Sequence, residues 1–130
     1  LLAAQDSARI MNRLTFENQV QGGLVMGLGL ARTEERVLDR NTGKMCNVNW
    51  HDYKIPTALD VPAEQKVHSV DLVDTECNTA GAKGVGEPAT IPTAAAIANA
   101  VHDAVGIRVH DSPVTPPRLV ALLAGRGKKG

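Results

Sequence analysis

The feature that most restricts the fold is an apolar segment, residues 15–30, which also carries several glycines. Its large apolar side chains recur every four residues and so share one helical face: Phe16, Val20, Leu24 and Leu28. The same segment contains Gly22, Gly23, Gly27 and Gly29. Each glycine would weaken an isolated helix by about 1 kcal/mol. We therefore predict a buried helix whose backbone packs closely against another element.

The composition limits the classes of protein that this chain can represent. Its 130 residues fit one modest domain, and aromatic residues contribute only 2%. The 14 basic and 14 acidic residues cancel, so no polycationic surface for nucleic acid or membrane is predicted. No apolar run approaches the roughly 20 residues of a membrane span. We predict one domain over residues 1–125, followed by a flexible basic tail over residues 126–130.

Turn residues and β-branched residues indicate several extended segments after the first helix. Residues 41–43, Asn-Thr-Gly, predict a tight turn between two strands. Residues 47–55 continue in extended fashion, and partial alternation predicts a strand over residues 67–73. Residues 107–111 predict another strand.

Start and stop signals define two further helices. Thr90 as the capping residue, Pro92 in the first turn and Gly106 just past the end predict a helix over residues 90–105. A short helix over residues 118–124 is predicted to end at Gly125. The order predicts a mixed α+β fold, a single-domain fragment whose helices pack on a small mixed sheet.

A glycine-rich loop connects the strand over 67–73 to the helix over 90–105. Gly81, Gly84 and Gly86 allow its backbone to approach another group closely. Glu87 ends the loop just before the helix, and Pro88 fixes the direction of the chain. By residue type alone, a carboxylate here favours a capping or helix-dipole role. The alternative is a general base.

A nucleotide-binding loop is a weaker alternative for the same residues. Gly84 to Ala89 fits the dinucleotide pattern G-x-G-x-x-G/A between a strand and a helix. The strand ends about ten residues too early for that tight junction, and Glu87 would lie beside the pyrophosphate. The P-loop pattern fails because Lys83 precedes Gly84, with no Ser or Thr beside it.

Histidine and cysteine do not indicate a metal site within the chain. The histidines lack metal-ligand spacing, and no residue is assigned as a protein ligand of a metal. Cys46 and Cys77 form no CxxC pair, which favours two buried or idle thiols over a zinc site or a disulfide.

Several ordered motifs resemble the xanthine dehydrogenase/aldehyde oxidase family across nearly the whole chain. The resemblance is carried by Asn18-Gln19-Val20-Gln21-Gly22-Gly23, Met26-Gly27-Leu28-Gly29, Asp52-Tyr53-Lys54-Ile55-Pro56-Thr57, the run from Gly81 to Pro88, the run from Ala94 to Val101, Gly106-Ile107-Arg108-Val109 and Pro113-Val114-Thr115-Pro116. The chain is most similar to bacterial molybdopterin-binding subunits. The resemblance implies that residues 1–125 are a C-terminal segment of the second molybdenum-cofactor-binding domain.

The resemblance also implies roles for particular residues. It makes Glu87 the general base beside molybdenum, and it places Gln19, Gly84, Val85 and Gly86 at the cofactor. The implied enzyme is a molybdenum hydroxylase that oxidises aldehydes or N-heterocycles such as xanthine, with water as the oxygen source. Lys83 is left open between a charge near the site and a solvated residue.

Further components follow from the resemblance rather than from the chain's own residues. The implied cofactors are molybdenum–molybdopterin, with iron–sulfur clusters and, in some members, FAD in other domains or subunits. The implied partners are the N-terminal part of the molybdenum subunit, iron–sulfur and flavin subunits or domains, and a small aldehyde or heterocyclic substrate. A bacterial cytoplasmic location is expected, with the periplasm as the alternative, and neither nucleic acid nor membrane is an expected partner.

The chain alone is expected to be inactive, because other cofactor contacts and the substrate pocket lie outside it. Two alternatives stay open. The first is a catalytically inactive orphan fragment that acts only as an interaction module. The second, less favoured, is a dinucleotide-binding fold.

Overall fold

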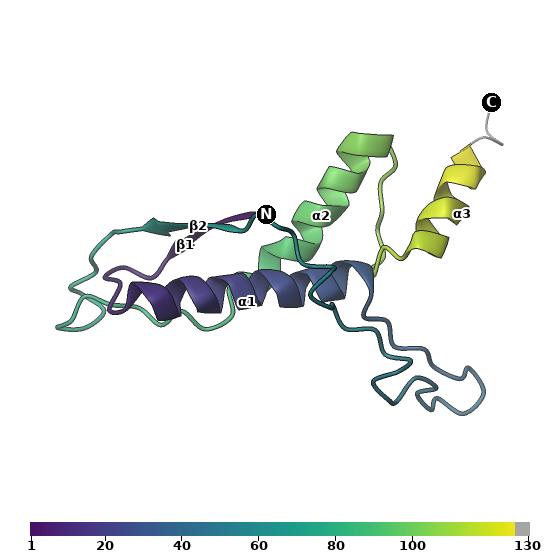
Figure 1. The fold of residues 1–130 in the computed structure, drawn as a ribbon, viewed down its shortest axis with the longest axis horizontal. Helices are drawn as coiled ribbons and strands as arrows, with labels where there is room; N and C mark the ends of the chain where they lie inside the picture. Colours follow the sequence, from purple (N-terminus) through teal and green to yellow (C-terminus); the bar gives the residue numbers. More distant parts are fainter. Residues whose placement is uncertain (127–130) are drawn as a thin grey trace.

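The computed structural model describes residues 1–126 of the chain. The elements follow in the order β1 (Leu2–Asp6), α1 (Arg13–Arg32), β2 (Lys66–Val70), α2 (Thr90–Val105) and α3 (Pro116–Arg126). Figure 1 shows an elongated arrangement in which α2 leaves the long helix α1 near its middle and α3 lies beyond its end. Arg126 is the last residue of α3, and residues 127–130 of the predicted basic tail lie outside the described residues.

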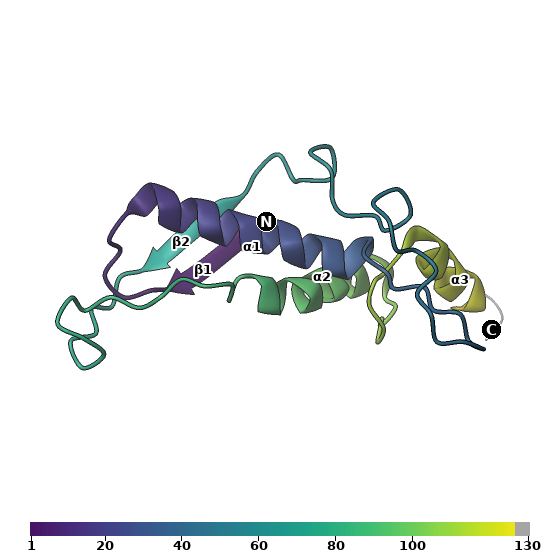
Figure 2. The ribbon, with the colours of Figure 1, turned by 90° about the horizontal axis from the view of Figure 1, so that it is seen from below.

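The two strands form a parallel sheet that α1 covers. Their register runs from Leu2 opposite Lys66 to Asp6 opposite Val70. Parallel strands need a long crossover connection, and α1 together with the segment 33–65 provides it. Both strands lie alongside the first half of α1 (Figure 2). The predicted α+β class, with helices on a small sheet, is confirmed, and the sheet of the described residues is parallel.

The prediction for α1 is confirmed in its face and in its close packing. The four large apolar residues of the predicted face are at most 5% exposed: Phe16, Val20, Leu24 and Leu28. A Cβ placed on Gly23 would lie 2.9 Å from the Cβ of Ala89, and one on Gly27 would overlap Thr93. The start of α2 therefore rests directly on the backbone of α1, which explains these two glycines.

The predicted helix and its end at Val105 are confirmed, but α2 begins at Thr90, so the capping role predicted for this residue is wrong. Ala89 occupies the cap position with helical dihedral angles, and no side chain caps the helix. The Thr90 hydroxyl instead donates to the carbonyl oxygen of Gly23, at 3.2 Å. Gly106 ends the helix in the left-handed conformation, with φ 68°, and its N–H donates to the carbonyl of His102.

Other predictions outside the helical core were wrong in detail. β1 was not predicted, the segment 107–111 is irregular, and α3 continues through Gly125. The predicted strand–turn–strand around residues 41–43 reduces to one bridge between Leu38 and Met45. Cys46 and Cys77 are free, but both are exposed rather than buried. No helix described within residues 1–126 has the length and apolar character needed to cross a lipid bilayer.

Candidate functional site

A side-chain hydrogen bond joins the glycine-rich loop to the first half of α1. The Nε2 of Gln19 donates to the carbonyl oxygen of Gly86, at 2.9 Å, across a separation of 67 residues. Gln19 lies on the exposed side of α1, so its amide reaches the loop from the helix surface. Two predicted site residues from distant parts of the chain are therefore in direct contact.

The structure explains the need for glycine at two of the three glycine positions of the loop, but not at the third. Gly81 and Gly86 have φ of 65° and 51°, a left-handed conformation that side chains disfavour. Gly84 does not have a positive φ, and a Cβ placed on it would meet no described atom within 4 Å. Nothing in the described chain requires glycine at position 84.

Backbone N–H groups after Lys83 have no acceptor within the described residues. The N–H of Lys83 donates to the carbonyl of Ser7, at 3.0 Å, and the next loop donor with a partner is Thr90, which bonds Glu87, also at 3.0 Å. Within residues 1–126, the N–H groups of 84–87 donate to no protein atom. Such groups need water or a ligand as partner, and successive N–H groups suit acceptors of partial negative charge.

Val85 lies between two hollows of the surface. It is half-buried and packs against the core cluster that includes Phe16. On one side is a cavity of about 320 Å³, to which Gln19 and Lys83 also contribute. On the other is an open groove of about 560 Å³, lined by residues 84–88 and by the first turn of α2. Gln19 and Glu87 thus line different hollows, and Val85 contributes to both.

Glu87 is exposed, and its carboxylate has no hydrogen bond or ion pair with any described residue. The start of α2 has no side-chain cap, so the capping role considered for Glu87 is not observed. Pro88 follows directly, and Gly86 precedes it in a left-handed conformation. The carboxylate therefore stands on a defined backbone with no structural partner of its own.

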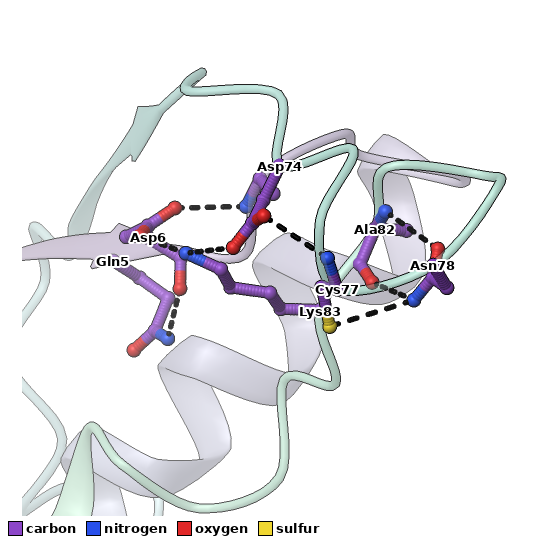
Figure 3. A network of polar contacts seen from close by, with 8 residues as sticks. Gln5, Asp6, Asp74, Cys77, Asn78, Ala82 and Lys83 are labelled. Carbon is purple, nitrogen blue, oxygen red and sulfur yellow. Dashed lines mark hydrogen bonds and ion pairs between the residues drawn. The ribbon is translucent and has the colours of Figure 1, made fainter.

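Lys83 forms ion pairs with two carboxylates, although its side chain remains 36% exposed. Its Nζ lies 2.8 Å from Asp6 at the end of β1 and 3.4 Å from Asp74 after β2 (Figure 3). The hydrogen bond to Asp6 raises the pKa of Lys83, and the same bond, followed by the Ala8 N–H, lowers the pKa of Asp6. Sequence reasoning missed both carboxylates: Asp6 lies 77 residues from Lys83, and nothing in the pattern of the loop indicated that Asp74 turns toward Lys83.

Comparisons with known proteins assign the chain to a family. Residues 1–62 match the profile of the molybdopterin cofactor-binding domain. The chain belongs to the family of molybdenum-binding subunits of xanthine dehydrogenases and aldehyde oxidoreductases, as the motifs predicted.

Two relatives and one solved structure illustrate the match. The xanthine dehydrogenase molybdenum-binding subunit of Escherichia coli O157:H7 is 43% identical over 120 residues, 92% of this chain and 16% of the relative. The aldehyde oxidoreductase molybdenum-binding subunit of Escherichia coli K12 is 40% identical over 123 residues, 95% of this chain and 17% of the relative. Quinoline 2-oxidoreductase from Pseudomonas putida 86 superposes with a TM-score of 0.86 at 28% identity, covering 95% of this chain and 16% of that chain.

Proposed function

We propose that this chain forms one wall of the molybdenum–molybdopterin site of a molybdenum hydroxylase. The observation that carries the proposal is the loop 84–87, which combines free backbone N–H groups with the unpartnered Glu87 carboxylate. The whole enzyme would oxidise an aldehyde or an N-heterocycle, the classes named in the relatives. Its iron–sulfur clusters and any FAD would lie in other domains or subunits.

The residues of the loop fit a pterin cofactor. A pterin with its phosphate offers oxygen and nitrogen acceptors, which match the row of free N–H groups at 84–87. The open space beside Gly84 allows a flat group to approach the backbone. Gln19 uses its amide nitrogen on Gly86, and its Oε1 accepts no bond from the described chain, so it remains available as an acceptor.

In this proposal Glu87 moves a proton and the backbone orients it. The bound cofactor supplies the redox chemistry of the hydroxylation, a division of labour typical of cofactor enzymes. The Glu87 carboxylate accepts the proton of the attacking water oxygen, the work of a general base. Gly86 and Pro88 fix the direction of the carboxylate, and Gln19 holds the Gly86 carbonyl in place.

The test is Glu87→Gln in the molybdenum subunit that carries this chain, assembled with its partner subunits. The amide has nearly the same size as the carboxylate but cannot accept the proton. Molybdenum content per subunit should be unchanged, while turnover per molybdenum should fall by about 100-fold or more. Metal analysis and steady-state kinetics with an aldehyde and an N-heterocycle measure the two quantities.

Glu76→Gln is the matched control, because Glu76 is another exposed carboxylate in the connection between β2 and α2. It should leave turnover and molybdenum content unchanged. Near-normal turnover of Glu87→Gln would overturn the assignment of the base. A wild-type subunit that binds no molybdenum would instead support the alternative of an inactive interaction module.

A further inference from the structure

Side chains from two distant parts of the chain meet at the Lys83 ammonium, in a group outside the residues assigned to the cofactor. Asp6 ends β1, whereas Asp74 and Lys83 both lie in the connection between β2 and α2 (Figure 3). All three side chains are about one-third to two-fifths exposed, at 40%, 33% and 36% respectively. The group is therefore accessible from the surface, yet it connects elements that are far apart in the sequence.

Each carboxylate uses its two oxygens for different purposes. Asp6 accepts the N–H of Ala8 with Oδ1, at 2.8 Å, and the Lys83 ammonium with Oδ2. Asp74 accepts the N–H of Cys77 with Oδ1, at 3.1 Å, and approaches Lys83 with Oδ2. Each carboxylate therefore fixes its own backbone turn and the lysine at once.

The backbone around this group is tightly constrained. Ala8 has φ 52°, unusual for a residue with a side chain, and it is fully buried. Ala8 and Ala82 form an antiparallel bridge, and the Arg9 N–H donates to the carbonyl of Gly81 at 2.9 Å. Residues 81–83 of the loop thus pair with residues 7–9, and the ion pair between Lys83 and Asp6 adds a side-chain contact beside this pairing.

The local charge argues against an anion-binding role for Lys83. Two carboxylates face one ammonium, which leaves the group with a net negative charge. Exposed ion pairs also contribute little to global stability. The ion pairs of Lys83 should therefore act locally, on the conformation of the loop, because the row of free N–H groups begins at the residue directly after Lys83.

We propose that Lys83 is a positioning residue, which Asp6 and Asp74 hold so that the loop 84–87 stays in register with the end of β1. The loop is then held from two sides, by this ionic contact before Gly84 and by the Gln19 bond at Gly86. The inference rests on the proposed function for its effect on turnover. Its structural part, the order of the loop, does not depend on that function.

The structural arm uses Lys83→Met and Asp6→Asn in the full subunit, with hydrogen exchange followed by mass spectrometry. Methionine keeps an unbranched stem without the charge, and asparagine keeps an oxygen for the Ala8 N–H. In both variants the amide hydrogens of residues 81–87 should exchange several-fold faster than in wild type, and the exchange rates over residues 94–105 should be unchanged. Lys83→Arg should restore the wild-type rate, and Lys66→Met, which removes the exposed Lys66–Glu64 pair, should change nothing in the loop. Unchanged exchange over residues 81–87 in both test variants would overturn the proposal.

The functional arm measures turnover per molybdenum in the same variants. Lys83→Met and Asp6→Asn should each lower kcat about tenfold with little change in KM, because small misplacement of a catalytic group is costly. The double variant should lose no more than either single variant, and Lys83→Arg should recover most of the rate. Faster loop exchange with normal kcat, or losses that add in the double variant, would overturn the positioning role. Glu87→Gln is measured in parallel. Normal turnover of Glu87→Gln would mean that the proposed function fails, whereas reduced turnover of Glu87→Gln with normal kcat of the Lys83 and Asp6 variants would mean that only the positioning role fails.

Discussion

The glycines of α1 and the glycine at position 84 of the loop differ in what surrounds them. Gly23 and Gly27 face the first turn of α2, and a methyl group on either would collide with Ala89 or Thr93. Gly84 faces open space, and its backbone conformation does not require glycine. Glycine at positions 23 and 27 is thus needed for helix packing, whereas no contact within the described chain explains glycine at position 84.

This difference separates two kinds of constraint on the sequence. In α1 the absence of side chains at Gly23 and Gly27 lets α2 pack closely against the helix, beside the buried apolar residues of the core. In the loop the missing side chain of Gly84 leaves free space, and the N–H groups of residues 84–87 have no acceptor within residues 1–126. Substitutions at the two sites should therefore separate stability from cofactor binding.

The largest effect on stability is expected for Gly27→Ala. The added methyl group overpacks the contact with Thr93, at a cost of about 1–3 kcal/mol, offset by about 1 kcal/mol of better helix propensity. The expected net result is a loss of up to about 2 kcal/mol in the local free energy of opening. Hydrogen exchange over residues 13–32 and 90–105 of the subunit measures it.

Gly22→Ala is the matched control on the same helix. A Cβ at Gly22 meets no described atom within 4 Å, so this substitution should cost nothing and slow exchange in α1. If Gly27→Ala proved as harmless as Gly22→Ala, the close packing of α2 on α1 would be contradicted.

A smaller and purely local effect is expected on acidification. The pKa of Asp6 lies below its ordinary value of 3.8, because the folded chain stabilises the carboxylate through Lys83 and the Ala8 N–H. This contribution is present above the ordinary value and is lost as the pH falls through the lowered value. Exchange over residues 81–87, corrected for the intrinsic pH dependence, should therefore accelerate progressively as the pH is lowered from 6 to below 3.8.

The acid response has an internal control. In Lys83→Met the lowered pKa should largely disappear, so the variant should exchange fast at both pH values. An acid acceleration of the same size in wild type and variant would show that another group is responsible.

Local patterns predicted the helices well and the sheet poorly. Four-residue spacing identified the buried face of α1, and Gly106 marked the end of α2, because both signals act within a few residues. β1 was missed because its alternation is weak and its partner β2 lies more than sixty residues away. The segment 107–111 resembles a strand in sequence but has no partner strand within the described residues.

The candidate site was predictable as residues but not as an arrangement. Glu87 and the glycines form one contiguous motif, whereas the bond between Gln19 and Gly86 depends on tertiary packing. The roles of Thr90 and Lys83 were misjudged or left open for the same reason. Gly23, the partner of Thr90, and Asp6, a partner of Lys83, are distant in the sequence and close only after folding.

Gly84→Ala in the full molybdenum subunit tests whether this loop faces the cofactor. The melting temperature of the cofactor-free subunit should be unchanged, because the added methyl group meets no atom of the described chain. The content of molybdenum and molybdopterin per subunit should fall clearly, because the same methyl group would stand between the loop backbone and the cofactor. A variant with wild-type cofactor content and turnover would contradict the claim that this loop faces the cofactor.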